Sequence, residues 1–256
     1  MKKNITSIFL ISVLLVAIIV PISIAATAGN KEVIVSVDGI AERSELNKTY
    51  VIESLADKKI EVTYDISRKV SDGFSDIYKD SNGNDYIYKN GKLTGFYSNE
   101  IKAPNTKCIP IGETLAKEIA VKVLSKFTDN TNDYVIRDFE EKKNYGQYYV
   151  TIARKLGDIY TEEYAIVSIM YDGSIKSVAV YNDGEFDNVS DDIVKGITED
   201  MLKAYAVSEM GIIYPDKGNS FEVRDYCLEH DENGYYINIH GNIGTMAESV
   251  RYDLES

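Results

Sequence analysis

The chain has 256 residues and a formal net charge of −13, because 41 Asp and Glu outnumber 28 Lys and Arg. This acidic balance argues against nucleic acid and anionic lipid as partners. It suits a soluble protein outside the cytoplasm, although solubility alone also explains it. The length indicates roughly two or three modules after any leader is removed. Frequent Asn, Lys, Ile and Tyr indicate, by association, the AT-rich genome of a Gram-positive bacterium.

The segment 1–28 is predicted to be a secretory signal peptide. Two lysines near its start precede an apolar run over 8–20, Pro21 interrupts that run, and 26–28 offers a small-x-small cleavage site. The alternative is an uncut membrane anchor, because residues 8–28 carry no charge and about 20 apolar residues span a bilayer. In both cases the chain beyond it is expected to be extracytoplasmic, either secreted or anchored to the cytoplasmic membrane.

Residues 29–108 are predicted to be a β-rich segment. A short apolar run and two alternating patterns indicate strands at 32–37, 50–52 and 60–64. Asn82-Gly83 and Asn90-Gly91 each follow a Tyr-Lys pair, and Asn-Gly readily adopts the positive φ angles of a tight hairpin turn. Residues 75–98 are therefore predicted to form a small meander of Tyr-rich strands.

Beyond this segment the sequence repeats itself at a constant offset. Tyr148-Tyr149-Val150 recurs as Tyr235-Tyr236-Ile237, an offset of 235 − 148 = 87 residues. At the same offset Arg137-Asp138 recurs as Arg224-Asp225. A repeat of this length indicates a duplicated supersecondary unit.

Each copy is predicted to begin with an amphipathic helix. The first helix, over about 112–127, begins without a capping side chain. Its expected apolar stripe is Leu115, Ile119, Val123 and Phe127. In the second helix Thr198 can cap the first turn and Pro215 stops the last. Its expected stripe is Leu202, Ala206, Met210 and Ile213.

Strands are predicted to follow both helices. Those of the first copy are expected at 133–141, 147–155, 162–171 and 174–181, and the second copy ends after a strand at about 247–254. The predicted fold class is α+β, with units 109–188 and 189–256 each packing one helix on an antiparallel sheet. A small β-rich segment and an N-terminal hydrophobic helix precede them. Because the second unit is truncated, we expect another part of the chain, such as the N-terminal strands, to cover its open edge.

Three segments of the first copy resemble a PepSY domain, namely Glu113–Ala120, Gly146–Ile152 and Tyr164–Ile175. The resemblance covers about 110–182, and 198–256 less closely. It implies an α+β unit that is often repeated and often lies outside the cytoplasm, in secreted peptidase propeptides or membrane-associated bacterial proteins. Some members are thought to inhibit or chaperone a peptidase. The family has no catalytic residues, so the resemblance assigns none here.

The sequence predicts no catalytic, cofactor-binding or metal-binding residues. His230 and His240 are its two histidines, and neither lies in a hydrolase motif. Cys108 and Cys227 are permitted to pair in an oxidising compartment, but sequence alone does not set their distance, and their pairing stays open. The residues 80–85 resemble the start of a calcium loop but lack its later ligands, so a hairpin turn is the simpler interpretation.

The predicted function is a non-catalytic module of the bacterial cell envelope that binds an unknown protein or peptide and modulates a peptidase. Two alternatives remain, a calcium-dependent surface structural protein and a hydrolase without a recognisable motif. No cofactor and no nucleic acid are expected, and the membrane is involved only if the leader stays uncut. Tyr148 and Tyr235 are expected to pack against the helix side. Tyr149 and Tyr236 share the more polar face, where packing and partner binding both remain open.

Overall fold

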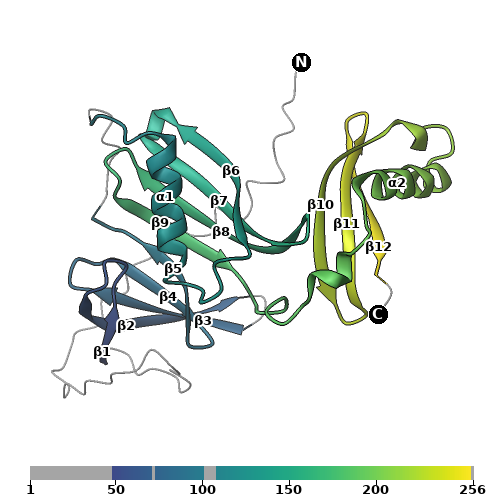
Figure 1. Cartoon of the computed structure of the whole chain (residues 1–256). Helices are drawn as coiled ribbons and strands as arrows, with labels where there is room; N and C mark the ends of the chain where they lie inside the picture. Colours follow the sequence, from purple (N-terminus) through teal and green to yellow (C-terminus); the bar gives the residue numbers. More distant parts are fainter. Residues whose placement is uncertain (1–47, 71–72, 101–107, 255–256) are drawn as a thin grey trace. The chain divides into compact units, whose positions relative to one another are not determined.

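The computed structural model describes residues 48–70, 73–100 and 108–254 (Figure 1). The predicted leader 1–28 and the predicted strand 32–37 therefore lie outside the described residues. Within the described ranges, neither helix has the length and apolar character needed to cross a membrane.

Twelve strands of the described chain belong to one sheet. The first five are β1 (Thr49–Glu53), β2 (Lys59–Val70), β3 (Gly73–Asp80), β4 (Asp85–Lys89) and β5 (Lys92–Tyr97). The next four are β6 (Tyr134–Lys142), β7 (Gln147–Leu156), β8 (Ile159–Met170) and β9 (Ile175–Tyr181). The last three are β10 (Phe221–Asp231), β11 (Gly234–Ile243) and β12 (Met246–Asp253). The main path runs β1-β2-β3-β4-β5-β9-β8-β10-β11-β12, and β7 pairs with β8 and β6.

The predicted meander over 75–98 is confirmed as β3, β4 and β5. Its turns use the expected residues, since Gly83 has φ +79°, and Asn90 and Gly91 have φ +51° and +78°. Both values of the second turn are positive, as a two-residue hairpin turn requires. The strands that follow also begin and end close to their predicted bounds.

The predicted fold class, with two repeated helix-on-sheet units behind a separate β-rich segment, is wrong. Strand β5 pairs antiparallel with β9 through Gly95–Tyr97, and β10 pairs parallel with β8 through Cys227 and Leu228. The result is one continuous mixed sheet with two α-helices in the described chain. The physical reason is that edge strands carry unpaired backbone groups, and neighbouring strands supply the missing partners.

The second unit was expected to have its open edge covered by the N-terminal strands, and for the described strands this expectation is also wrong. Strands β1 to β5 join the sheet at β9, at the opposite end of the path from β12. Within the described residues β12 pairs only with β11, so its outer side is an edge.

Helix α1 (Glu113–Leu124) contacts β6, β7 and β8, and begins after Gly112 without a capping side chain, as expected. Its buried residues are Ala116, Ala120, Val123 and Leu124. The predicted stripe is wrong at Leu115, which is exposed. The helix presents its two alanines to the sheet instead, and small side chains allow closer approach of helix and strands.

Helix α2 (Glu199–Ile213) contacts β10 and β12. The Thr198 hydroxyl accepts a hydrogen bond from the Met201 backbone N–H at 3.2 Å, which confirms the predicted cap. Leu202, Ala206 and Met210 are buried as expected, whereas Ile213 is exposed at the last position of the helix. Short 3₁₀ turns lie at Lys143–Tyr145, Asp191–Val194 and Gly218–Ser220.

The repeat in the sequence has a local counterpart in the strands. A β-bulge separates Ile136 from Asp138 in the β6–β7 pair, and another separates Val223 from Asp225 in the β10–β11 pair. These positions differ by 223 − 136 = 87 residues, the offset of the sequence repeat. The repeated Arg137 and Arg224 therefore both occupy the extra position of a bulge, where strand twist increases and side chains are re-aimed.

Candidate functional site

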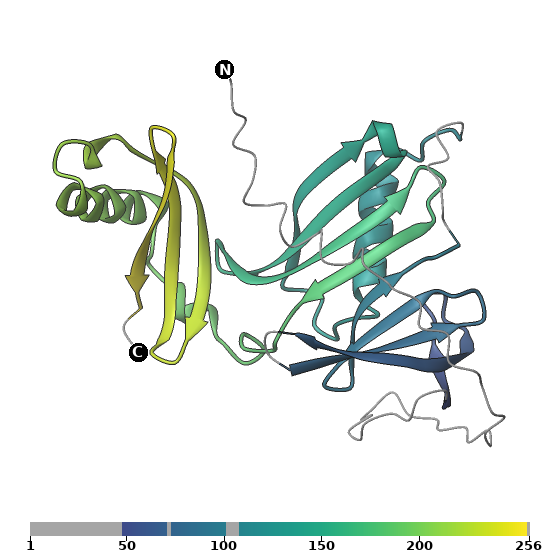
Figure 2. The same cartoon turned by 180° about the vertical axis from the view of Figure 1, so that it is seen from behind.

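The candidate site is the face of the sheet opposite the helices, where β8 meets β10. Leu228, Ile237 and Ile239 pack with the α2 side chains, so their strand neighbours point to the other face. Strand pairing aligns one row of side chains on that face across β7, β8, β10, β11 and β12, namely Lys155, Tyr160, Cys227, Asn238 and Arg251. This row and its neighbours Arg137, Asp225, Glu229, Tyr236 and His240 are called the seam face below. Figure 2 shows the sheet from the side opposite α1.

Tyr160 lies at the centre of the seam face. The Arg137 guanidinium and the Lys155 ammonium each lie 4.8 Å from the centroid of its ring. Cations at this distance are attracted by the ring quadrupole. Arg137 also forms an ion pair with Asp225, which connects β6 to β10. The two charged contacts hold the phenol ring in place, and Tyr160 as a whole is half-buried.

Glu229 organises the β10–β12 part of the seam face. Its carboxylate accepts hydrogen bonds from the Tyr236 hydroxyl at 2.7 Å and from the Asn238 amide at 2.9 Å. The bond to this carboxylate raises the pKa of Tyr236 to about 12. His240 Nε2 lies 3.9 Å from the same carboxylate. A tyrosine held in its neutral form in this way is a donor and a packing surface, not a base.

Arg251 covers the Tyr236 ring from β12, with its guanidinium carbon 3.8 Å from the ring centroid. It also forms ion pairs with Asp231 and Asp253. The hydrogen bond from Arg251 lowers the pKa of Asp231 to about 2. At this end of the seam face, Arg251, Asp231 and Asp253 are therefore ion-paired with one another.

Tyr149 and Tyr236, for which packing and partner binding both remained open, hold hydrogen bonds within the chain. Both are half-buried on the face opposite the helices, and both donate hydrogen bonds, Tyr149 to Gln147 Oε1 at 3.1 Å and Tyr236 to Glu229. Nearby, the rings of Tyr164 and Tyr181 stack with centroids 4.6 Å apart. The face is therefore lined by fixed aromatic rings.

Sequence reasoning did not find most of this site. The sequence showed the Arg137-Asp138 repeat without a role and placed Tyr236 on the more polar face, but it did not single out Lys155, Tyr160 or Arg251. Lys155 and Tyr160 face each other in the β7–β8 hairpin, but they join the side chains of β10, β11 and β12 only through the parallel β8–β10 pairing, which involves two residue pairs and leaves no local pattern.

The two cysteines are not joined to one another by a disulfide in the structure. Burial raises the pKa of the Cys227 thiol to about 12, so it is not a nucleophile at neutral pH. His230, near the end of β10, lies with Nδ1 3.6 Å from Glu185 and its ring 4.6 Å from that of Tyr235, its partner on β11. No group suitable for holding a metal ion occurs among the described residues.

The calcium-loop resemblance at 80–85 corresponds to a hairpin turn. The Asp80 carboxylate accepts hydrogen bonds from the backbone N–H groups of Asn82 and Asn84, both at 2.9 Å. It also accepts one from the Asn84 side-chain amide at 2.9 Å. Its oxygens thus bind the turn itself, which is the behaviour of an Asx turn.

A second charged cluster is structural. Arg154 is buried on the helix side of β7, and its Nη1 donates to Glu163 at 2.9 Å and to Asp187 at 3.0 Å. Nη2 reaches Asp133 at 3.3 Å. Glu163 also accepts the backbone N–H of Gly184 at 3.1 Å. The cluster therefore ties β7 and β8 to the chain that leaves β9, and solvent has little access to its centre.

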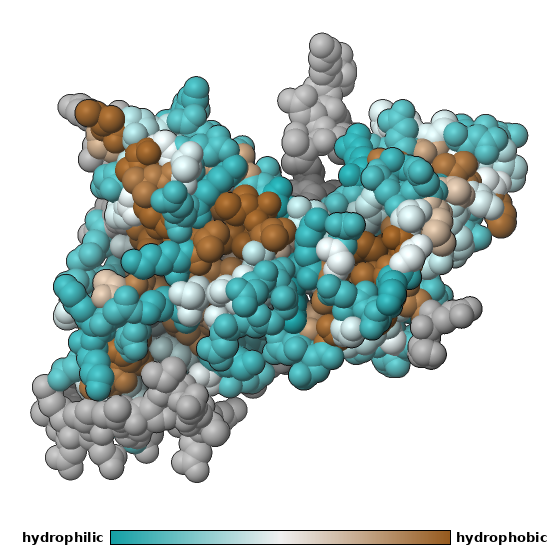
Figure 3. Space-filling model, in the orientation of Figure 1, coloured by the Kyte–Doolittle hydropathy of each residue, from teal (hydrophilic) through white to brown (hydrophobic). Residues whose placement is uncertain are grey.

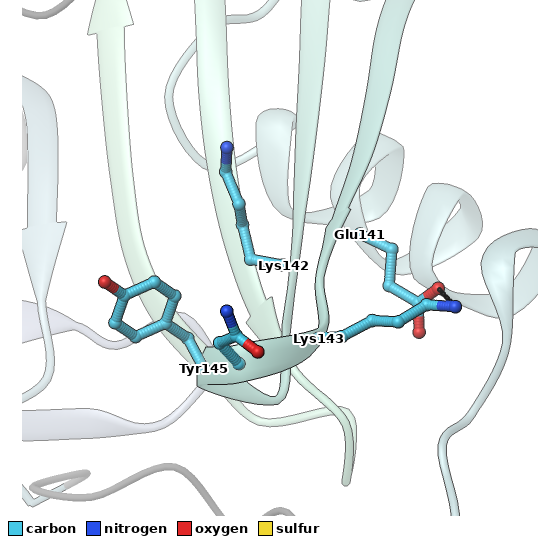
Figure 4. Close-up of a pocket in the computed structure, with 5 residues that line it drawn as sticks. Glu141, Lys142, Lys143 and Tyr145 are labelled. Atoms are coloured by element: carbon cyan, nitrogen blue, oxygen red, sulfur yellow. Dashed lines mark ion pairs between the residues drawn. The ribbon is translucent and has the colours of Figure 1, made fainter.

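Two hollows of the described surface are shallow. One of about 190 Å³ is lined by residues 141–145, and one of about 340 Å³ by residues 157–159, 191–192 and 194–197. Figure 4 shows that Lys142 and Tyr145 point away from the Glu141–Lys143 pair. Polar groups that diverge in this way do not form a binding site for a small molecule.

No protein-family model matches the chain, and no curated protein matches it. A solved structure, that of the Bacillus megaterium YpeB C-terminal domain, is similar with a TM-score of 0.36 and 13% sequence identity. The similarity covers 82% of this chain and 85% of that one.

Proposed function

We propose that this protein is a non-catalytic, extracytoplasmic module that binds a protein or peptide partner through the seam face. The observation that carries the proposal is the alignment of Tyr160, Tyr236, Arg137 and Arg251 on one face of the sheet. Tyrosine and arginine are the side chains that contribute most often to the binding energy of protein interfaces.

The seam face is preorganised for binding. The Tyr160 ring lies against two cations, and the Tyr236 ring lies against Arg251 and is hydrogen-bonded to Glu229. Side chains that are already held lose little rotational freedom when a partner arrives, so more of the contact energy remains for affinity. A half-buried sheet face without a deep hollow suits an extended or folded polypeptide better than a small molecule.

The chemistry of the same residues supports binding rather than catalysis. Tyr236 and Cys227 both have pKa values raised to about 12, so neither provides a base or a thiolate near neutral pH. The Glu229 carboxylate is already engaged by Tyr236 and Asn238. An acid–base pair needs a reacting group within reach and a pKa near the working pH.

The location and the class of partner rest on the sequence. The leader 1–28 supports export, and the resemblance of 110–182 to PepSY domains supports the cell envelope. The same resemblance favours a peptidase as the partner whose activity is modulated. An acidic protein with net charge −13 is consistent with this setting.

Site-specific photo-crosslinking tests the proposal. A photoreactive phenylalanine analogue replaces Tyr236 or His240 of the seam face in cells that export the protein, and a matched variant carries it at Tyr145, which is 60% exposed in a shallow hollow. We expect one discrete polypeptide adduct from the seam face and none from position 145. Equal labelling from all three positions, or labelling from none, would contradict the proposal.

The peptidase version has its own test. The purified protein is added in excess to envelope fractions while the cleavage of generic peptide substrates is followed. We expect a change in rate that the double variant Tyr160→Ala/Tyr236→Ala reduces by about tenfold, the size of a 1.4 kcal/mol loss. An unchanged rate rejects peptidase modulation, while the crosslinking result still decides whether the seam face binds a polypeptide.

A further inference from the structure

Three Asn-Gly pairs of the described chain lie in hairpin turns of the sheet. Asn82-Gly83 joins β3 to β4, Asn90-Gly91 joins β4 to β5, and Asn233-Gly234 joins β10 to β11. All three asparagines are exposed. Asparagine followed by glycine is especially prone to deamidation, because glycine has no side chain to obstruct the attack of its own backbone nitrogen. The three pairs share this sequence, so the turns around them decide which asparagine reacts.

Deamidation requires such a turn to open. The glycine backbone nitrogen gives up its proton and attacks the side-chain carbonyl carbon of the asparagine. The new C–N bond closes a five-membered succinimide ring, and the side-chain nitrogen leaves with that proton as ammonia. Water then opens the ring at one of its two carbonyls, which gives aspartate or isoaspartate. Ring closure rotates the asparagine backbone out of the turn, so hydrogen bonds that hold the turn slow the reaction.

Aspartates hold two of the turns closed. Asp80 and Asp231 each lie two residues before an asparagine, in the pattern Asp-x-Asn-Gly. Their carboxylates accept the backbone N–H of that asparagine, at 2.9 Å in the first turn and 2.8 Å in the second. The Gly83 N–H donates to the Asp80 backbone carbonyl at 3.0 Å, and Gly234 pairs with Asp231 in the β10–β11 ladder. Attack at either asparagine therefore requires several hydrogen bonds to break first.

The turn at Asn90 lacks this aspartate. Tyr88 lies two residues before Asn90, and the Gly91 N–H makes no hydrogen bond within the described residues. The turn consists of Asn90 and Gly91 alone, and Lys89 pairs with Lys92 across it. Like charges directly opposite each other on neighbouring strands destabilise the pairing. This turn is therefore the easiest of the three to open.

Charge and solvent act in the same direction. The attacking nitrogen is negatively charged once its proton has left, and nearby cations stabilise that charge whereas carboxylates destabilise it. Lys89 and Lys92 flank the Asn90 turn, while the other two turns contain the carboxylates of Asp80 and Asp231. Water also reaches the turn, since Asn90 is exposed and the described surface over the first five strands is largely hydrophilic in Figure 3.

We propose that Asn90 is a site of spontaneous modification, at which the folded protein loses ammonia and takes up water to give aspartate or isoaspartate. Asn82 and Asn233 are protected by their turns. The product places a new carboxylate beside Lys89, whose ammonium lies 3.1 Å from Asp183. Isoaspartate also adds one methylene group to the backbone of a two-residue turn. The modification is therefore expected to weaken the Lys89–Asp183 ion pair and to loosen the β4–β5 hairpin.

Peptide mapping by mass spectrometry of the purified protein, aged at pH 8, tests the proposal. The chymotryptic peptides 79–86, 89–93 and 229–235 separate the three asparagines. We expect Asn90 to react at least about tenfold faster than Asn82 or Asn233, because more than one hydrogen bond holds each of the other turns. In urea the turns are lost and the three rates should converge. Equal rates in the folded protein, a faster reaction at Asn82 or Asn233, or the same order of rates in urea overturns the proposal.

Variants of Asp80 test the cause of the protection. Asp80→Ala removes the carboxylate that holds the Asn82 turn and is expected to raise the rate at Asn82 at least about fivefold. Asn233 should stay slow in the same sample, which shows that the rest of the chain remains folded. Asp80→Asn keeps an acceptor for the turn and should keep Asn82 slow. Asp129→Ala, at an exposed aspartate outside the three turns, is the matched control and should change none of the rates. If Asn82 reacts as slowly in Asp80→Ala as in the wild type, the turns do not set the rates and the proposal is overturned.

Discussion

Arg137 and Asp225 form an ion pair that connects β6 to β10. Each belongs to an Arg-Asp dipeptide, and the two dipeptides are copies separated by 224 − 137 = 87 residues. The first residue of one copy therefore binds the second residue of the other. Both arginines occupy β-bulges, and the bulge in β6 re-aims Arg137 across the sheet towards β10. The duplicated motif thus serves as a joint between the two copies.

This pair is expected to contribute modestly to stability. Arg137→Ala and Asp225→Ala, alone and together, form a double-mutant cycle followed by urea unfolding. The side chains are 27% and 42% exposed, so we expect a coupling energy of about 0.5–1 kcal/mol that falls at high salt. The exposed Lys195–Asp192 pair serves as the control and should show almost none. A coupling energy of zero for both pairs would contradict a role for the Arg137–Asp225 ion pair in joining the two copies.

The buried cluster around Arg154 is expected to matter far more. The Arg154 and Glu163 side chains are 2% and 3% exposed, so Arg154→Met leaves a buried carboxylate without its cation. We expect this change to lower the free energy of unfolding by about 3–5 kcal/mol. Lys117→Met removes an exposed pair on α1 and should cost less than about 0.5 kcal/mol. The double variant Arg154→Met/Glu163→Leu is expected to be more stable than Arg154→Met alone, and the opposite order would show that the charges themselves are not the cause.

The Asp231–Arg251 pair predicts a pH dependence of stability. Arg251 holds the pKa of Asp231 at about 2 in the folded chain, below its ordinary value of 3.8. The unfolded chain therefore takes up the proton first as pH falls, so the contribution of the ionised carboxylate is present above pH 4 and is lost towards pH 2. The stability difference between wild type and Asp231→Asn should shrink over that window. A difference that stays constant from pH 6 to pH 2 would contradict the assignment.

The thiols provide a check on the cysteines. Because Cys108 and Cys227 are not bonded to one another, non-reducing denaturation should expose two reactive thiols for each chain, and a disulfide would expose none. In the Cys108→Ser variant, burial and the pKa of about 12 should make Cys227 react slowly at pH 8. Unfolding in urea should accelerate the reaction at least about tenfold, since an ordinary thiol has a pKa near 8.5. Fast labelling of the folded variant would show that Cys227 is accessible.

Local features of the fold were predictable. The turns at Asn82-Gly83 and Asn90-Gly91, the cap at Thr198 and the strands of the repeat all follow from backbone preferences over a few residues. The buried face of helix α1 was harder to predict. Leu115 matches the spacing of a core residue, yet Ala116 and Ala120 occupy that side, because the distance between helix and sheet decides which residues fit.

The sequence by itself determined where strands, helices and turns lie, since hydrophobic period and turn chemistry act within a short stretch of chain. It also determined the repeat, the net charge and the absence of familiar catalytic motifs. Only the tertiary structure decided that β5 joins β9 and that β10 joins β8, and hence that Tyr160 lies beside Cys227 on one face. Any open strand edge offers the same backbone donors and acceptors, so the choice among edges depends on distant parts of the chain meeting in three dimensions.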